Sequence, residues 1–411
     1  MANLTQLRMA AREIYQEALG SIDARDAVRR VMRVEGERLI IRDFSLDIAR
    51  KIYLIAIGKA AGSMASAIES TLGAKLTSGI IAGPRQTPQF PPGSRWQLFA
   101  GGHPLPTEAS LLAGKAALDL LERANNEGAV VIFLVSGGGS AMIEWPINRD
   151  ITLENLRMAN QALVASGASI GEVNAVRRAF SFIKGGRMAA KAQHCDQVTL
   201  IVSDVPRGQE WNVASGPAIR PAPDAPKARE VVEKYQLRAR LPAPILRAID
   251  SGHETTSAGK STNIREHFVL LSNEEAVKAA ASAALRRGFT LDVAQDISDE
   301  QIESGCEKLL RRLAGLNASA EATGGSDLCV ISGGEFSCPV KGDGLGGRNL
   351  ETALRLAIAG TNLPGFVALC AGTDGIDGNS PAAGAIVDHT TSDRAKRIGL
   401  DPQDFLNRSD A

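Results

Sequence analysis

The sequence is poor in aromatic residues, has no excess of charge of either sign, and contains few cysteines. Aromatic residues make up 4% of the 411-residue chain, too few to indicate a platform that stacks the bases of single-stranded nucleic acid. Lys plus Arg and Asp plus Glu each number 46, so the formal net charge is zero. A polyanion partner normally needs a basic face. These absences argue against a nucleic-acid partner.

Disulfides, zinc sites and membrane spans are also disfavoured. The five cysteines are an odd number and none forms a Cys-x-x-Cys pair, which favours a reduced, cytoplasmic compartment. The longest apolar run, about Ala129 to Val135, is far shorter than the ~20 residues of a membrane span. Arginine and glutamate interrupt the first 20 residues, so they do not resemble a signal peptide. We expect a cytoplasmic protein without a membrane partner.

Glycine is abundant instead, with 41 residues, and much of it follows apolar runs. Three such runs are Ile52–Ile57, Val130–Val135 and Gln197–Val202, each followed by a glycine or serine turn. Continuous apolar runs are typical of strands buried on both faces of a parallel sheet. Their alternation with helical patterns predicts a doubly wound α/β architecture.

A second α/β set follows a stretch rich in proline at 217–226 and one rich in Ser, Thr and Gly at 251–263. Its predicted strands are 267–271, 290–293, 328–331 and 366–370, and its predicted helices are 274–287, 299–314 and 348–359. Near the N-terminus we predict an amphipathic helix over 4–19 and short antiparallel strands over 38–48. We predict an N-terminal domain of residues 1–240 and a C-terminal domain of residues 241–411.

One glycine turn, Ser136-Gly137-Gly138-Gly139-Ser140, follows a predicted strand and precedes a helical pattern. Such a turn can present backbone N–H groups to an anion. No Walker Gly-Lys-Ser/Thr follows, and a dinucleotide fingerprint would need Gly or Ala where Met142 stands. A phosphate cradle and a tightly packed turn explain the motif equally well.

Charged residues accompany several of these turns. Lys59 follows the strand at 52–57, at the end where open α/β sheets bind ligands. Asp204 ends the strand at 197–202 and could ligate Mg²⁺ or accept a hydroxyl proton. Lys184 and Arg187 flank a Gly-Gly turn and could hold an anion. The alternatives are an exposed surface lysine for Lys59 and a helix N-cap for Asp204. For Lys184 and Arg187 the alternative is a solvated charged face.

The second half has two further turns of this kind. Arg348 begins a predicted helix after four glycines, where its charge opposes the helix dipole unless an anion binds. Asp374 and Asp377 are three apart in a glycine loop, as metal or ribose contacts often are, although the loop lacks the EF-hand pattern. An Asx turn is the alternative. His103, a lone histidine, is expected to be structural. Together, cations and aspartates at glycine-rich strand ends match what phosphoryl transfer requires.

Eight motifs occur in a fixed order along almost the whole chain. They are Ile57-Gly-Lys-Ala-Ala61, Gly102-His-Pro-Leu-Pro106, Val135-Ser-Gly-Gly-Gly-Ser140, Val176-Arg-Arg178 with Ile183-Lys-Gly-Gly-Arg187, Val202-Ser-Asp-Val205 with Ala214-Ser-Gly-Pro217, Ser332-Gly-Gly-Glu335, Gly346-Gly-Arg-Asn349, and Gly372-Thr-Asp-Gly375 with Ala382-Ala-Gly-Ala385. This set resembles the glycerate 2-kinase family with a C-terminal MOFRL domain, whose members are often misnamed hydroxypyruvate reductases.

The resemblance implies an ATP- and Mg²⁺-dependent kinase that converts D-glycerate to 2-phosphoglycerate. It implies a Rossmann-like α/β/α N-terminal domain, a smaller α/β MOFRL domain, and a site between them. The family's catalytic lysine and arginine fall on Lys59 and Arg348. By the same resemblance, the turn at 136–140 is part of the nucleotide or substrate cradle, and Asp204 is the metal ligand or orients the hydroxyl. The further site residues implied are Lys184 and Arg187, as phosphate contacts, and Glu335, Asp374 and Asp377.

The sequence departs from the family pattern in several places. Pro206-Arg207 stands where the family has Gly-Asp, Leu350 replaces a glutamine, and Ala179-Phe180 replaces His-Leu. The family's last glycine-rich motif is absent, so we expect the C-terminal domain to be shortened at its end. Two alternatives remain open: an NAD(P)H-dependent hydroxypyruvate reductase, and a binding protein that kept the kinase fold without turnover.

Overall fold

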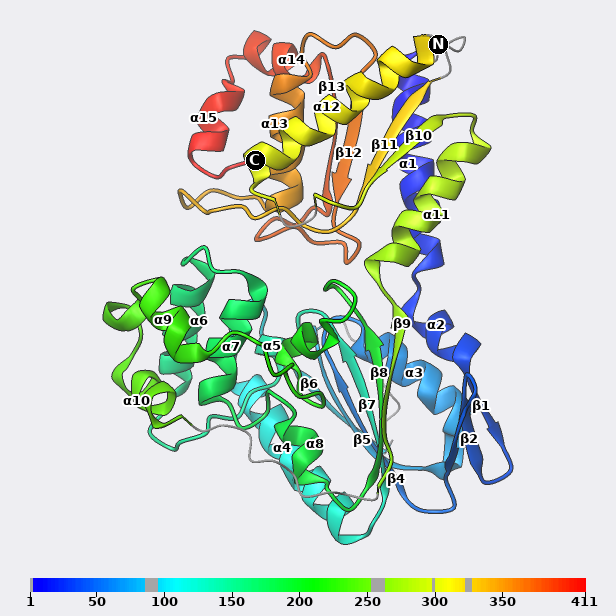
Figure 1. Ribbon diagram of the computed structural model, residues 1–411, viewed down its shortest axis with the longest axis vertical. Coiled ribbons are helices and arrows are strands. Elements are labelled where there is room, and N and C mark those ends of the chain that lie inside the picture. The colour runs from blue at the N-terminus through cyan, green and yellow to red at the C-terminus, as the bar shows by residue number, and fades with distance from the viewer. Residues whose placement is uncertain (1–2, 86–94, 253–262, 298–299, 322–326) are drawn as a thin grey trace. The chain divides into compact units, whose positions relative to one another are not determined.

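The computed structural model of the protein describes residues 3–85, 95–252, 263–297, 300–321 and 327–411 (Figure 1). The chain divides into two compact units. One is Asp23–Ser272, and the other joins Met1–Ile22 to Asn273–Ala411. Among the described residues, no helix is long and apolar enough to cross a membrane. The predicted helix start at Asp299 and most of the Ser/Thr/Gly-rich stretch lie outside the described residues.

The unit Asp23–Ser272 is built on a six-stranded sheet in the order β6-β5-β4-β7-β8-β9, with every neighbouring pair parallel. The strands are β4 Ile52–Ile57, β5 Leu76–Gly83, β6 Trp96–Ala100, β7 Val130–Ser136, β8 Asp196–Val202 and β9 Arg265–Leu271. Every residue of β4 and β7 is buried, as expected for central strands with helices on both faces. The predicted doubly wound α/β fold is confirmed.

The helices of this unit are α2 Ala24–Val31, α3 Ala61–Leu72, α4 Glu108–Asn126, α5 Gly139–Met142, α6 Leu153–Val164, α7 Ile170–Phe180, α8 Arg187–Lys191, α9 Ala228–Lys234 and α10 Ala243–Ser251. Some of them pack on the sheet, and α6, α7, α9 and α10 form a separate group beside it (Figure 1). Capping boxes at Thr152 and Ser169 fix the starts of α6 and α7. Helices α6, α7, α9 and α10 share a hydrophobic core of their own around Val176 and Phe180.

Short elements complete this unit. The predicted antiparallel strands are present as β1 Met32–Glu35, β2 Arg38–Ile41 and β3 Phe44–Asp47. Two 3₁₀ segments, η2 Glu210–Ser215 and η3 Leu237–Ala239, follow the sheet strand β8. Segment η2 contacts α5 and α7, which places it beside the glycine turn that follows β7.

The other unit contains two two-stranded sheets, β10-β11 parallel and β12-β13 antiparallel. Its strands are β10 Thr290–Ala294, β11 Leu328–Ser332, β12 Val367–Ala371 and β13 Gly384–Asp388. Its helices are α1 Leu4–Ser21, α11 Asn273–Arg286, α12 Ile302–Glu321, α13 Arg348–Ala359, α14 Thr391–Arg397 and α15 Pro402–Asn407. A core around Ile302, Phe336 and Leu356 holds it together. The prediction of a smaller second α/β domain is confirmed.

The units are bounded differently from the predicted division at residues 240 and 241. Strand β9 pairs with β8, with His267 opposite Thr199, so the assignment of this strand to the second α/β set is wrong. Helix α1 belongs to the C-terminal unit, where Glu13 and Glu17 form ion pairs with Arg287 beyond α11. The apolar pattern identified both segments but carried no information about their packing partners.

Candidate active site

The turns after β4 and β7 are joined by hydrogen bonds. The backbone N–H of Lys59 donates to the carbonyl oxygen of Gly137 at 2.9 Å. The hydroxyl of Ser136 accepts from the N–H of Ala60 at 3.0 Å and donates to the carbonyl oxygen of Ile57 at 3.2 Å. Two motifs almost 80 residues apart in the sequence are therefore one local structure.

Glycines permit this close approach. Gly58 has φ +108°, and a Cβ there would overlap Ser136. Gly138 has φ +77°, and a Cβ there would lie 3.0–3.1 Å from side-chain carbons of Lys59 and 3.2 Å from the His103 ring. Both backbone conformations favour glycine. The side chains of Lys59 and His103 thus lie directly against the glycine turn.

Asp204 lies at the same place from a third strand. It follows β8, and a Cβ on Gly137 would overlap its carboxylate. Because β4, β7 and β8 are adjacent parallel strands, their carboxyl ends meet at one edge of the sheet. The structure therefore brings together Lys59, the turn at 136–140 and Asp204, each of which the sequence indicated as a candidate site feature.

Asp204 is the candidate ligand for a divalent cation at this edge of the sheet. No group of three or more His, Cys, Asp or Glu that could hold a metal is present among the described residues. Mg²⁺ usually takes one or two carboxylates and completes its shell with water and substrate phosphates. A single carboxylate against a glycine turn fits that mode of binding and does not fit an all-protein metal cage.

Ser140 connects the turn to the strained end of η2. Its hydroxyl lies 2.8 Å from that of Ser215, which donates to Asn174 at 2.8 Å. Ala214 and Ser215 have φ of +52° and +62°, a conformation that costs non-glycine residues of order 1–3 kcal/mol. The hydrogen bonds that hold Ser215 against the glycine turn help to offset that strain.

Lys184 lies in a buried ion pair. Its ammonium is 2.5 Å from Glu144, and the two residues are 1% and 2% exposed. Ser181 donates a further hydrogen bond to the Glu144 carboxylate at 2.5 Å. Burial lowers the pKa of Lys184, and the charge of Glu144 acts in the opposite direction. These contacts indicate an internal structural role for Lys184, which differs from the predicted phosphate contact.

Arg187 is also committed to internal contacts. Its guanidinium donates to the carbonyl oxygens of Arg178 and Ser181, at 2.5 and 2.8 Å. Burial lowers the pKa of Arg187. Arg187 and Lys184 therefore fix the loop between α7 and α8, and a phosphate contact by either residue stays a prediction.

The Glu144–Lys184 pair should be important for stability. We expect Glu144→Gln to destabilise the Asp23–Ser272 unit by about 3–5 kcal/mol, because it leaves a buried ammonium without its counter-ion. Urea unfolding followed by tryptophan fluorescence measures this, since Trp96, Trp145 and Trp211 all lie in that unit. The control is Asp119→Asn in the exposed pair with Lys115, for which we expect no measurable change. Equal midpoints for the two variants would contradict the assignment.

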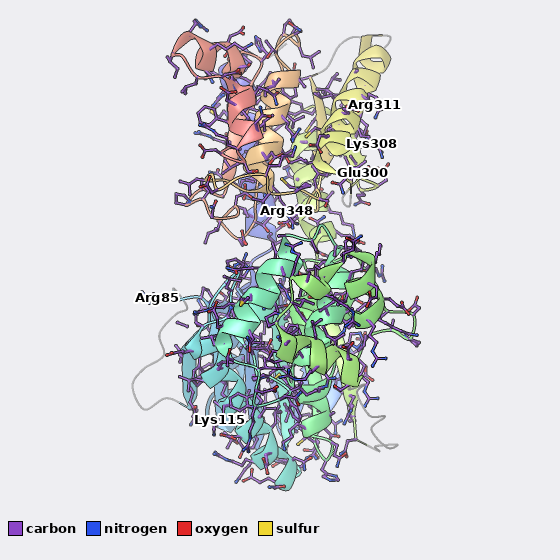
Figure 2. All side chains as sticks on the ribbon, turned by 90° about the vertical axis from the view of Figure 1, so that its left-hand side faces the viewer. Arg85, Lys115, Glu300, Lys308, Arg311 and Arg348 are labelled. Atoms are coloured by element: carbon purple, nitrogen blue, oxygen red, sulfur yellow. The ribbon has the colours of Figure 1, made fainter. Side chains whose placement is uncertain are left out.

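In the C-terminal unit, Arg348 begins α13 and its side chain is exposed (Figure 2). The guanidinium lies 2.6 Å from the carboxylate of Glu335. Two predicted site residues are therefore in contact. An exposed ion pair of this kind contributes ~0–1 kcal/mol, so an incoming anion can readily replace Glu335 as the partner of Arg348.

Asp377 holds the start of that helix. It is 4% exposed and accepts from the backbone N–H groups of Asn349, at 3.1 Å, and Leu350, at 2.7 Å. A carboxylate at this place satisfies two free N–H groups and complements the helix dipole. Asp377 is therefore a capping residue that positions Arg348, and its contacts do not indicate a metal or ribose ligand.

Asp374 forms an Asx turn, the structural alternative to a ligand contact. Its carboxylate accepts from the N–H of Ile376 at 3.2 Å, which is the geometry of an Asx turn. Tyr15 of α1 donates to the carbonyl oxygen of Gly372 at 2.7 Å. Burial, followed by the charge of Asp374, raises the pKa of Tyr15. Helix α1 thus supports the loop that carries Asp374.

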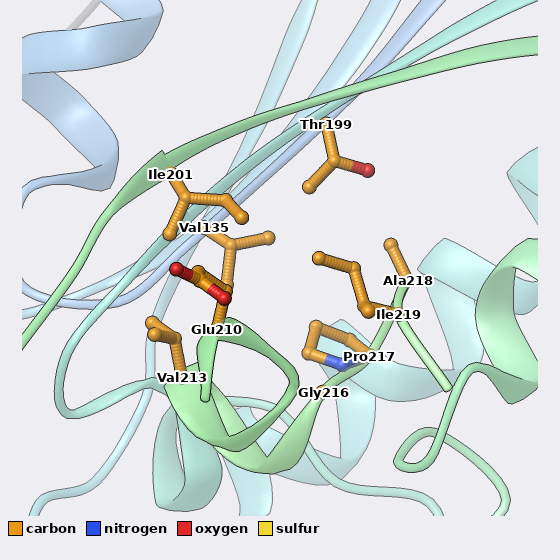
Figure 3. A pocket seen from close by; sticks show the side chains of 9 residues that line it. All are labelled: Val135, Thr199, Ile201, Glu210, Val213, Gly216, Pro217, Ala218 and Ile219. Atoms are coloured by element: carbon orange, nitrogen blue, oxygen red, sulfur yellow. The ribbon is translucent and has the colours of Figure 1, made fainter. Parts of the chain in front are cut away.

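A small cavity beneath η2 is not the substrate site. It is lined by Val135, Thr199, Ile201, Glu210, Val213, Gly216, Pro217, Ala218 and Ile219 (Figure 3). Its volume is about 10 Å³, which is room for about one water molecule. A nucleotide or a sugar acid does not fit, so the candidate site remains at the glycine-rich edge of the sheet.

Sequence reasoning missed the polar residues behind this edge. Glu144 is an isolated acid with no motif around it, and Asn174 lies inside an ordinary helical pattern. Arg178 lies in one of the eight motifs, but the motif alone does not indicate what it contacts. Burial would have distinguished all three, and a single sequence gives no direct measure of the burial of polar residues.

Comparison with known proteins identifies the family. A family described as a domain of unknown function (DUF4147) matches residues 10–250, and the MOFRL family matches residues 328–411. A D-glycerate 2-kinase of Thermotoga maritima is 35% identical over 88% of this chain and 84% of its own length. A glycerate 2-kinase of Pyrococcus horikoshii is 31% identical over 97% of this chain and 90% of its own length.

Other relatives carry a second name, and a solved structure agrees with the first. A protein of Agrobacterium vitis, 31% identical over 100% of this chain and 89% of its own length, is named putative hydroxypyruvate reductase. The crystal structure of a glycerate kinase from Thermotoga maritima has a TM-score of 0.74, with 30% identity over 99% of this chain and 92% of that one. The chain belongs to the glycerate 2-kinase family, with a DUF4147 domain followed by a MOFRL domain.

Proposed function

We propose that the protein is an ATP-dependent kinase that phosphorylates the 2-hydroxyl group of D-glycerate. The observation that carries the proposal is the convergence of Lys59, the glycine turn at 136–140 and Asp204 at adjacent strand ends. Membership of the family and the names of the glycerate kinase relatives support it. Phosphoryl transfer requires mainly positioning and charge stabilisation, and this edge of the sheet offers both.

Each residue of the candidate site would have a separate role in phosphoryl transfer. The ammonium of Lys59 compensates negative charge on the transferring phosphoryl group, at a strand end where ligands bind. The glycine turn lets phosphate oxygens approach backbone N–H groups without interference from a Cβ. Arg348, on the first turn of α13, adds a second positive charge to the phosphates.

Asp204 is the residue proposed to hold Mg²⁺ together with the substrate phosphates. When bound, the ion neutralises phosphate charge and favours in-line geometry. The carboxylate of Asp204 can alternatively accept a hydrogen bond from the glycerate hydroxyl and orient it. We also propose a cytoplasmic location, since all five cysteines are free, as is typical of a reducing compartment.

Incubation of the protein with ATP, Mg²⁺ and D-glycerate, followed by phosphorus NMR, tests the proposal. We expect a 2-phosphoglycerate signal. A 3-phosphoglycerate signal would retain the kinase and overturn the choice of hydroxyl. Absence of both, with NADH oxidation in the presence of hydroxypyruvate, would establish the reductase instead. Absence of all three activities, with retained binding of ATP and D-glycerate, would establish a binding protein.

A further inference from the structure

Arg178 is a buried cation without a carboxylate partner. It is 7% exposed. In the part of the chain that the structure describes, no Asp or Glu oxygen lies within ion-pair distance of its guanidinium. Isolated charges are costly to bury, so this arrangement needs an explanation that packing alone does not supply.

The contacts of Arg178 fix its position without neutralising it. The guanidinium carbon lies 5.0 Å from the centre of the Trp211 ring, and one nitrogen is 3.4 Å from the amide oxygen of Asn212. Its aliphatic carbons lie against Gly185, where a Cβ would be 3.1 Å from Cδ. An aromatic face and a neutral amide orient the planar group, and they leave its full charge in place.

The charges next to Arg178 are also mainly positive. Arg177, Lys184 and Arg187 all interact electrostatically with the carboxylate of Glu144. Arg178 gains nothing from it: burial, followed by the charge of Arg187, lowers the pKa of Arg178 to about 10. The guanidinium is therefore still charged at neutral pH.

Arg178 nevertheless keeps access to solvent. Among the described residues, His389 Nδ1 is the one fully buried side-chain nitrogen or oxygen without a hydrogen-bond partner. The Arg178 nitrogens that Asn212 does not engage are therefore not sealed in the interior. They keep some solvent exposure and remain available as hydrogen-bond donors.

A short hydrogen-bonded path joins Arg178 to the glycine turn. Asn212 accepts from Arg178 through its side chain, and its carbonyl oxygen accepts from Asn174 at 3.0 Å. Asn174 accepts from Ser215, which contacts Ser140 of the turn. Arg178 thus belongs to the same polar network as the candidate active site.

We propose that Arg178 binds an oxyanion of a substrate, either the carboxylate of the sugar acid or a phosphate of the nucleotide. A planar guanidinium binds two oxygens of either group at once. This inference rests on the proposed function for the identity of the two substrates. It adds a specificity-determining residue to Lys59 and Arg348.

Ligand binding to Arg178 variants tests the proposal. Affinities of the wild-type protein, Arg178→Lys and Arg178→Gln for D-glycerate and ATP would be measured separately by calorimetry, with adenosine as the ligand without phosphates. We expect the ligand that contacts Arg178 to bind ~10- to 100-fold more weakly in both variants. Adenosine should be unaffected. Arg238→Gln, an exposed, ion-paired arginine of the same unit, is the matched control and should bind like the wild type.

The outcomes separate the two anions. Weaker binding of D-glycerate assigns the carboxylate, weaker binding of ATP assigns a phosphate, and unchanged affinity for both overturns the proposal. Should the variants fail to fold, the wild-type protein still decides. D-glycerate, ATP or inorganic phosphate should change the Trp211 fluorescence, and Trp211→Phe should remove that response; silence with all three probes also overturns the proposal. Wild-type binding without phosphoglycerate formation would reject the proposed function alone.

Discussion

Lys59→Ala is expected to lower kcat for D-glycerate phosphorylation by about 10²- to 10³-fold, the loss typical when one group that stabilises transition-state charge is removed. Phosphoryl transfer leaves little covalent work for the protein, so the loss of one well-placed charge should affect turnover strongly. Steady-state kinetics with ATP and D-glycerate varied in turn would measure it. KM should change much less than kcat, because the charge on the phosphoryl group develops during transfer.

The control for this variant is Lys115→Ala. Lys115 is an exposed lysine of α4 in the same unit, paired with Asp119 (Figure 2). It should keep wild-type kinetics. Lys59→Arg makes a stricter comparison, because it keeps the positive charge beside Gly138 and replaces a compact ammonium by a planar guanidinium. A kcat within threefold of wild type for both Lys59 variants would remove Lys59 from the mechanism.

The edge of the sheet that carries Lys59 could be predicted because parallel strands impose it. Three apolar runs ending near residues 57, 135 and 202 put Lys59, the turn at 136–140 and Asp204 each at the carboxyl end of a predicted parallel strand. That inference needs only the strand type and the position of each turn. The actual strand order, β4-β7-β8, makes the three turns immediate neighbours.

Packing partners could not be predicted in the same way. The segment at 265–271 has the pattern of a strand in either unit, and its pairing with β8 depends on which edge is free. Helix α1 has an amphipathic face that fits several surfaces, and tertiary contacts with α11 and Gly372 select one. Periodicity specifies the kind of element, and complementary surfaces specify its neighbour.

The role of a charged residue beside a glycine turn does not follow from its neighbours in the sequence. Lys184 and Asp377 have the sequence surroundings of ligand contacts, yet one is paired with Glu144 and the other caps α13. A glycine-rich loop that brings a backbone close to a phosphate equally brings it close to a protein carboxylate. Only three-dimensional contacts distinguish these two uses of the same local pattern.

Arg348→Ala should also lower kcat by about 10²- to 10³-fold, for the same electrostatic reason. The exposed pair with Glu335 does not reduce this expectation, because water and salt screen it. Asp377 fixes the first turn of α13, so the start of the helix should survive the substitution. Circular dichroism and the urea midpoint should therefore remain close to those of the wild type. A parallel loss of fold and activity would indicate a structural role.

Two companion variants give the Arg348 result its meaning. Arg311→Ala removes an exposed arginine of α12 in the same unit (Figure 2) and should leave kcat unchanged. Glu335→Gln frees Arg348 from its partner. If Glu335 pairs with Arg348 only until the phosphates of ATP bind, Glu335→Gln should lower the KM for ATP. It should leave kcat within about threefold of the wild-type value. A kcat loss comparable with that of Arg348→Ala would instead place Glu335 in the catalytic machinery, while full activity of Arg348→Ala would remove Arg348 from it.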